Sequence, residues 1–351
     1  MKKSVIASSM LLALLSGAAQ AQVETPTFYG AIRLAVTDAD TSFAVNPSGG
    51  EGTTIENNFS LVGLKGSASL TETVQLVYKA EAMVKSDDQD NKDGVLSSRD
   101  TFIGVKGEAG TLIFGKMGSA FWKAEGGVDQ FNLTNTDMGR LFAGNSRYGD
   151  MISYTSPRMY NTNVLVSYQL EDDAYGADVN REGSLYSVAV IHGDKALKKT
   201  NYFVGFGYNA GLGGDEAYRI SGQTKLGQLK LGAVYQDTKD LYNENLDGDG
   251  FMVDVAYPLS AKLSLKARYG QDDSGNGKYA GNVVKSLTDV GAADVTDSKV
   301  TNYAVGADYK LSKVAKLYGH YSRFEAELDN AAGRQYDDAD NIISMGLHYK
   351  F

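Results

Sequence analysis

The last eleven residues of the chain, 341–351, alternate between apolar and mostly polar side chains with a period of two. Because successive side chains of a β-strand point to opposite faces, this pattern predicts a strand with one apolar side. The apolar face continues to the final residue, where the ends of soluble domains usually fray in water. Such a face is typical of a strand that contacts lipid on one side and water on the other. Its members are Ile343, Met345, Leu347, Tyr349 and Phe351.

The N-terminal segment predicts export from the cytoplasm. Lys2 and Lys3 form a basic start, and an apolar run follows over residues 5–15. Ala19 and Ala21 then give the small-x-small pattern of a cleavage site, so the segment is typical of a secretory signal peptide. The apolar run is too short for a membrane-spanning helix.

We therefore expect residues 1–21 to be removed and residues 22–351 to form a single domain. Cysteine is absent, which excludes a disulfide framework and thiolate chemistry. The chain has 40 glycines and 22 tyrosines but only 4 prolines, a composition that suits a large antiparallel sheet. Its formal charge is −9, which disfavours nucleic acid as a partner.

The alternation found at the C-terminus recurs along the whole chain, in segments of about the ~9–11 residues that a tilted membrane-spanning strand needs. An even number of strands lets the last strand pair with the first, which removes the open edge that lipid would not tolerate. We count sixteen segments, which begin near Thr27, Glu56, Thr73, Ser98, Gly110, Arg147, Asn161, Gly183, Lys199, Glu216, Gln228, Asp249, Ala261, Lys299, Val314 and Asn341.

The connections alternate between short and long, so that the two kinds lie at opposite ends of an up-and-down meander. This pattern predicts an all-β fold, a 16-stranded antiparallel transmembrane β-barrel with short periplasmic turns and long outer loops. A soluble secreted β-protein would have more Leu, Ile and Val on its buried face, whereas here Tyr and Phe often end the apolar faces. The long connections cover residues 38–55, 86–97, 118–146, 171–182, 210–215, 239–248, 271–298 and 326–340.

Six segments together carry a family resemblance over the whole mature length. They are 28–30 (FYG), 61–66 (LVGLKG), 99–107 (RDTFIGVKG), 110–116 (GTLIFGK), 147–157 (RYGDMISYTSP) and 349–351 (YKF). On these segments the chain resembles the trimeric general-diffusion porins of the Gram-negative outer membrane, the Gram-negative porin family. The resemblance implies an outer-membrane channel for passive diffusion of small hydrophilic solutes and ions, not an enzyme.

The same resemblance implies several partners. We expect a homotrimer in contact with outer-membrane lipid and lipopolysaccharide, with residues 86–93 reaching the neighbouring subunit. In such porins the terminal aromatic side chains, here Tyr349 and Phe351, are part of the signal read by the barrel-assembly machinery during biogenesis.

The third outer connection, residues 118–146, corresponds to the loop that folds into the barrel and narrows the pore in the porins that the chain resembles. It carries the only tryptophan, Trp122, beside Phe121. Its acidic residues are candidates for the negative side of an electric field across the narrow part of the pore. Fixed charges of this kind bias the passage of ions through pores. The first choices are Glu125 and Asp129, and Asp137 is a reserve.

The resemblance also implies a basic wall that faces the loop, and here this wall is incomplete. Arg99 and Arg147 fall on arginine positions of the family, but Leu61 occupies a third. Arg33 lies two residues after the family's first-strand lysine position and faces the same way, and Lys79 has the lumen parity of its strand. With fewer wall cations in an acidic chain, we predict a mild cation preference.

Other functions find less support in the sequence, although two classes stay open. An outer-membrane barrel enzyme would need a Ser-His or Asp-His constellation, for which the three histidines offer no candidate. A substrate-selective channel could use Phe121, Trp122 and Tyr318 as aromatics along its path. Segment 110–116 has the spacing of a phosphate loop, but Met117 stands where Ser or Thr is required. Segment 245–250 resembles the start of a calcium loop, but its twelfth position is Ala256 instead of Glu. The three histidines show no metal-ligand spacing, so we expect no cofactor.

Overall fold

The computed structural model describes most of the predicted mature chain. The described residues are 25–45, 51–85, 94–170, 185–287, 290–291 and 294–351. The predicted signal peptide at residues 1–21 and the predicted subunit contact at residues 86–93 lie outside them.

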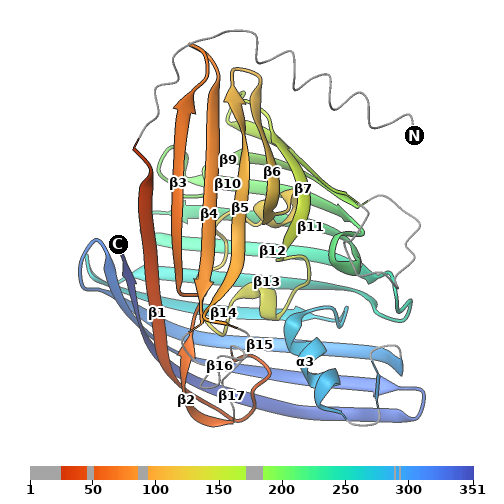
Figure 1. Cartoon of the computed structure of the whole chain (residues 1–351). Coiled ribbons are helices and arrows are strands. Elements are labelled where there is room, and N and C mark those ends of the chain that lie inside the picture. The colour runs from red at the N-terminus through yellow and green to blue at the C-terminus, as the bar shows by residue number, and fades with distance from the viewer. Residues whose placement is uncertain (1–24, 46–50, 86–93, 171–184, 288–289, 292–293) are drawn as a thin grey trace.

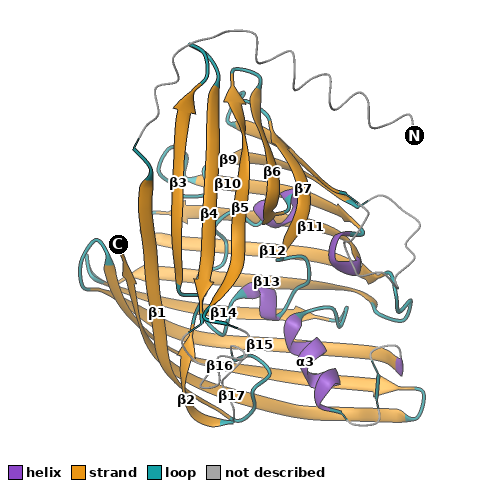
Figure 2. Ribbon diagram, in the orientation of Figure 1, coloured by secondary structure: helices purple, strands orange, loops and turns teal. Residues whose placement is uncertain are grey.

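The described residues form one antiparallel sheet that closes on itself as a barrel, with three short helical turns and one longer helix among its loops (Figures 1 and 2). None of the described helices is both long and apolar enough to cross a membrane. The strands are β1 (Thr27–Ala39), β2 (Gly52–Asn57), β3 (Leu61–Ser69), β4 (Gln75–Val84), β5 (Leu96–Gly107), β6 (Gly110–Gly118), β7 (Arg147–Thr155), β8 (Thr162–Gln169), β9 (Tyr186–Gly193), β10 (Tyr202–Ala210), β11 (Asp215–Leu226), β12 (Leu229–Asp240), β13 (Asp247–Pro258), β14 (Leu263–Asp272), β15 (Val295–Lys310), β16 (Ala315–Asn330) and β17 (Gly333–Lys350).

The seventeen labelled strands make a sixteen-stranded barrel, because β2 and β3 are two halves of one strand. Both pair with β1, β2 along its outer half and β3 along its inner half. The break between them falls at residues 58–60, where Phe59 adopts φ 66°. The predicted sixteen-stranded fold is therefore confirmed, with an interruption in the second strand that alternation alone did not reveal.

The C-terminal strand closes the barrel against the first strand. Its register with β1 runs from Ala31 opposite Lys350 to Ala39 opposite Ile342. The backbone of Phe351 adds a reciprocal pair of hydrogen bonds with Gly30, at 3.0 and 3.1 Å. A Cβ at Gly30 would lie 2.4 Å from the Phe351 ring, so only glycine allows the terminal ring to cover the strand there.

The two faces of the barrel follow the predicted alternation. Large apolar side chains are exposed on the outer face, where lipid would cover them, and Gly, Ser and charged side chains face the lumen. On β17 the outward set is the one expected from the sequence, with Ile343 at 64% and Phe351 at 47% exposure. Tyr303 and Tyr309 flank Val305 on the outer face of β15, as aromatic residues do near membrane interfaces.

The prediction of a long last outer loop over residues 326–340 is wrong. β16 extends to Asn330 and β17 begins at Gly333, so a two-residue turn joins two long strands. Arg334 on this hairpin bonds to Glu327 at 2.7 Å and Asp329 at 2.6 Å across the turn. The last strand starts earlier than the predicted Asn341 because the outward face of these strand ends is polar, so they lack the lipid-facing apolar alternation, while Leu328 and Tyr336 pack inward.

Two outer connections fold into the barrel. Residues 118–146 carry α2 (Ala120–Lys123) and the 3-10 turn η1 (Met138–Arg140), which confirms the predicted inward third loop. Residues 273–287 carry α3 (Lys278–Ser286), which packs on η1 and on β15 (Figure 1). A second 3-10 turn, η2 (Leu212–Gly214), joins β10 to β11. The inner apolar cluster that results includes Met138, Leu141, Phe142, Tyr279, Val283 and Phe324.

We predict that Val305→Arg destabilises the barrel by roughly 2–4 kcal/mol, since Val305 is 57% exposed on the lipid-facing side of β15 between two tyrosines. Urea unfolding in lipid vesicles measures this change. Ala331→Arg introduces the same charge in the outer turn, outside the lipid, and is expected to have little effect. Equal effects of the two substitutions would contradict the assigned lipid-facing surface.

Candidate pore constriction

The inward loop rests on a part of the lumen wall that has no side chains. Gly205 and Gly207 on β10 lie beneath Phe121 and Ala124, and Gly232 on β12 lies beneath Val128. A Cβ at Gly205 would approach the carbonyl oxygen of Ala124 to 2.1 Å. Gly205 and Gly207 alternate on β10 with Val204 and Phe206, which are exposed on the outer face. This row of glycines therefore decides how closely the loop can approach the wall.

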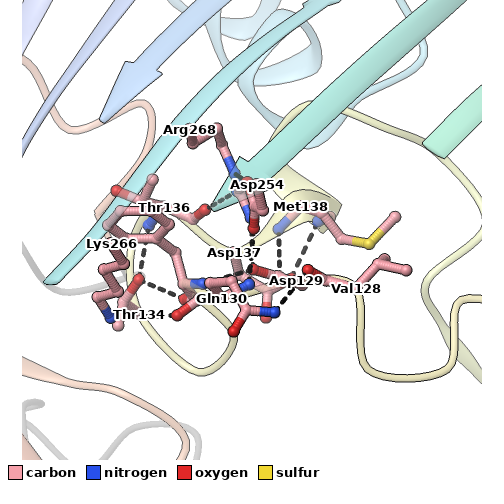
Figure 3. Close-up of polar contacts among 12 residues, drawn as sticks. Val128, Asp129, Gln130, Thr134, Thr136, Asp137, Met138, Asp254, Lys266 and Arg268 are labelled. Atoms are coloured by element: carbon pink, nitrogen blue, oxygen red, sulfur yellow. Dashed lines mark hydrogen bonds and ion pairs between the residues drawn. The ribbon is translucent and has the colours of Figure 1, made fainter. Parts of the chain in front are cut away.

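A buried ion cluster holds the middle of the loop to the far wall (Figure 3). Arg268 on β14 bonds to Asp254 on β13 through Nε and Nη2, both at 2.7 Å. The same guanidinium donates to Asp129 and to the carbonyl of Thr136 in the loop. Asp129 also accepts from the backbone N–H groups of Phe131 and Met138. Asp129, predicted as a pore-lining acid, is thus 8% exposed and paired within this cluster.

Glu125 lies in a second buried polar group at the root of the loop. Its Oε2 accepts from Asn145 at 2.7 Å and lies 3.9 Å from Arg219 Nη1 on β11. Arg219 is fully buried, donates to Gln236 and Ala143, and lies 4.4 Å above the ring of Phe121. Burial raises the pKa of the Glu125 carboxyl to about 8, despite the opposing attraction of Arg219.

Asp137 is the most open of the three predicted loop acids. It caps η1 by accepting from the N–H of Gly139 at 2.9 Å, and it also accepts from Leu133. Burial, followed by repulsion from Asp129, raises the pKa of its carboxyl. Close by, Asn135 bonds to Glu56 on β2 and to His320 on β16, so the loop crosses the lumen from the β8–β10 wall to these strands.

The wall that the loop leaves open carries the four predicted cations. Lys79 on β4 bonds to Glu81 at 2.8 Å and to Asp100 at 2.7 Å, and Asp100 bonds in turn to Arg147 at 2.6 Å. Arg99 lies 3.6 Å from Glu81, whose other oxygen accepts from Tyr29. The wall is therefore a chain of alternating charges in which cations outnumber carboxylates.

Arg33 completes this wall from β1 without a carboxylate of its own among the described residues. Its guanidinium donates to the carbonyl of Phe59 at the break between β2 and β3. The interrupted second strand thus supplies an acceptor where Leu61 replaces the arginine of the family pattern. Sequence alternation could not predict this contact, because it depends on the left-handed turn at Phe59.

A β-bulge and a cation–π contact shape the remaining part of the wall. The register between β4 and β5 shifts near Glu81, so that Arg99 and Asp100 both reach partners on β4. The guanidinium of Arg147 lies 4.6 Å from the centre of the Trp122 ring. Trp122 therefore connects the root of the loop to the basic wall. Its neighbour Phe121 is buried against Arg219 on β11.

Sequence reasoning missed the cations that hold the loop, Arg219, Lys266 and Arg268. Each has lumen parity on its strand, a signal that could have identified its side of the barrel. It also missed α3, although Tyr279, Ala280 and Val283 share one helix face. Tyr279 stacks on Phe324 at 4.6 Å and closes part of the outer lumen.

Between this helix and the inward loop, an outer cavity of about 550 Å³ leads toward the constriction. Its lining includes Phe142 from the inward loop, Tyr148 from β7, and Lys278 and Lys285 from α3. Solutes that enter from outside would therefore pass the end of α3 before they reach the loop.

A family model described as Gram-negative porin matches residues 7–329. The chain belongs to the Gram-negative porin family. It is an outer-membrane channel for passive diffusion, located in the outer membrane of a Gram-negative bacterium. Among curated relatives, the chain is 25% identical to the major outer membrane protein P.IB of Neisseria sicca over 366 aligned residues, covering all of this chain and 90% of the relative. It is 29% identical to the P.IB protein of Neisseria meningitidis serogroup A, covering all of this chain and 89% of the relative.

Several solved structures share the fold of this porin at low sequence identity. An anion-selective porin from Comamonas acidovorans superposes with a TM-score of 0.70 at 17% identity, over 93% of this chain and 99% of that one. OmpF of Salmonella typhi, in complex with daunomycin, superposes with a TM-score of 0.67 at 15% identity, over 93% of this chain and 97% of that one. OmpT of Vibrio cholerae, an outer membrane protein in a trimer form, superposes with a TM-score of 0.65 at 18% identity, over 93% of this chain and 99% of that one.

We predict that Arg268→Met lowers stability and loosens the loop, because Asp129 and Asp254 would then be buried carboxylates without their cation. Removing one partner of a buried ion pair costs about 3–5 kcal/mol. Thermal unfolding and single-channel conductance measure the two effects, and conductance should become larger or noisier. Adding Asp129→Asn and Asp254→Asn should recover part of the stability; an unchanged midpoint and conductance in the single variant would count against the role of this cluster.

Proposed function

We propose that this porin passes small hydrophilic solutes and ions through an opening between the inward loop and the wall that carries Arg33, Lys79, Arg99 and Arg147. One observation carries the proposal. The loop is held against the β8–β14 side of the barrel by the Arg268 cluster and the glycine row. The wall formed by β1, β4, β5 and the start of β7 keeps partly exposed charged side chains, among them Lys79 at 23% and Arg147 at 24%.

Fixed charges on both sides of this opening would sort solutes by charge and size without a dedicated binding site. The alternative of a substrate-selective channel with aromatics along its path gains little support. Phe121 and Tyr318 are 0% and 2% exposed, so of the three aromatics considered only Trp122 is partly open to the lumen.

Liposome swelling tests general diffusion directly. We expect swelling rates with uncharged sugars to fall steeply with sugar size and to rise linearly with concentration, since no sugar is bound on the way. A matched measurement with Trp122→Ala separates size exclusion from aromatic recognition, because only recognition would be lost. Saturation of the rate with one sugar, abolished by Trp122→Ala, would instead favour the substrate-selective alternative.

We propose a mild cation preference that depends on pH. The acidic chain and the incomplete basic wall favour cations. Two features limit this preference near neutral pH. Asp129 is neutralised by Arg268, and Glu125 has a pKa of about 8, so its carboxyl is largely protonated below that pH.

The pH dependence follows from the groups around Glu125. Arg219 and Asn145 favour its ionised form, whereas burial and the carboxylates of Asp129 and Asp137 oppose it more strongly. Because an acid is neutral below its pKa and charged above it, Glu125 adds a negative charge to the lumen as the pH rises through about 8.

We predict that the ratio of K⁺ to Cl⁻ permeability rises between pH 6 and pH 9. Reversal potentials in a KCl gradient across planar bilayers measure this ratio. Glu125→Gln removes the titrating group at similar size and should flatten the curve, while Arg158→Gln, at an inner turn away from the loop, should leave it unchanged. Clear anion selectivity at every pH would overturn the proposed cation preference. A permeability ratio that does not change with pH in the unaltered protein would show that Glu125 does not contribute to the selectivity.

Export and assembly complete the proposal. We propose that residues 1–21 are a cleaved signal peptide, which N-terminal sequencing of the membrane-inserted protein would test. We further propose a homotrimer in contact with lipopolysaccharide, assembled by the barrel-assembly machinery through Tyr349 and Phe351. The family and the trimeric form of one similar structure support the trimer. Native mass spectrometry would reject it by finding only monomers.

A further inference from the structure

A second cavity lies at the inner mouth of the barrel, beyond the constriction. Its volume is about 400 Å³. It is bounded by Asn132 and Leu133 of the inward loop and by the two short turns that join β13 to β14 and β15 to β16. Short turns lie on the periplasmic side of such barrels, so this cavity opens toward the periplasm.

Lysine dominates the lining of this inner-mouth cavity. Lys262, Lys310, Lys313, Lys316 and Lys350 contribute to it, together with a single carboxylate, Asp308. That carboxylate is already shared between Lys266, at 3.0 Å, and Lys316, at 2.8 Å. The cavity is therefore strongly cationic in a chain whose formal charge is −9.

The strand register places several of these groups directly opposite one another. Lys310 on β15 pairs with Lys316 on β16, and Lys316 pairs in turn with His348 on β17. Like charges in directly opposed positions of a sheet are destabilising. Asp308, which is shared between Lys266 and Lys316, cannot fully offset the repulsion between Lys310 and Lys316. A bound anion would offset it.

His348 supplies an independent sign of a missing partner. Its side chain lines the cavity and is only 6% exposed, and its Nε2 has no hydrogen-bond partner among the described residues. Buried polar atoms are nearly always hydrogen-bonded to protein, ordered water or an ion. An oxyanion in the cavity would give this nitrogen an acceptor when it carries the proton.

We propose that the inner-mouth cavity binds a small multivalent oxyanion, a solute with two or three negative charges on carboxylate or phosphate oxygens. Lysine ammonium groups are compact, strongly hydrated charges that suit such ligands without demanding a fixed geometry. The volume is sufficient for a small organic polyanion. The porin would thus hold anionic solutes briefly at its periplasmic exit. This binding would add to the proposed channel function, and the inference rests on that function.

The ligand is a soluble solute rather than a lipid headgroup. Lys310, Lys316 and Lys350 have lumen parity on their strands, whereas their strand neighbours Tyr309, Leu317 and Tyr349 are exposed on the outer face. A lipid phosphate would have to cross the wall of the barrel to reach the cavity.

Conductance block by citrate tests the site. Citrate added to the periplasmic side of porin in planar bilayers with KCl should reduce the single-channel current with a saturable concentration dependence. In Lys310→Gln/Lys350→Gln, the half-blocking concentration should rise by about fivefold, as expected for the loss of two exposed charge contacts. Neither lysine side chain takes part in the ion pairs around Asp308, so the fold should be retained.

The matched control removes two exposed lysines from the same end of the barrel. Lys198→Gln/Lys199→Gln changes the turn between β9 and β10, outside the cavity, and should leave the block unaltered. Two outcomes would overturn the site: no block in channels of normal conductance, or an equal shift in both double variants. Loss of KCl conductance itself would instead count against the channel function, so the two failures are distinguishable.

Discussion

The closed ladder of backbone hydrogen bonds is the constraint on which the rest of the structure depends. No water in the hydrocarbon region can satisfy a free strand edge, so a sheet in lipid must close on itself. Here closure is made between β1 and β17, and the backbone of Phe351 pairs with Gly30 at its inner end. Alternation then follows, because a closed sheet has one face for lipid and one for water.

Inside this frame, function depends on how the lumen is divided. Buried arginines, Arg219 and Arg268, hold the inward loop on one side and use its acids as partners. The opposite wall keeps Lys79, Arg99 and Arg147 linked through Glu81 and Asp100. The residues that anchor the loop are therefore largely separate from those that line the opening, and a carboxylate can be essential to the loop's position without facing the solute.

Sequence patterns predicted the barrel well because period-two alternation reports directly on lipid and water. They failed where that signal is missing. The outer hairpin around Arg334 is polar on its outward face, so it lacks the lipid-facing alternation and the sequence predicts a loop in its place. The constriction was harder to predict: Arg33, Arg99 and Arg147 could be chosen from parity and family pattern, but the partner of Asp129 is Arg268, which lies 139 residues away in the sequence.

The sequence by itself determined export, a sixteen-stranded lipid-facing barrel and an inward third loop, because each of these depends on local periodicity, length or family motif. Tertiary structure alone decided which acids are neutralised, how α3 narrows the outer lumen, and that five lysines from different strands and turns meet at the inner mouth. The physical reason is that strand register and loop docking set the distances between charges, and electrostatic energies depend on those distances and on burial.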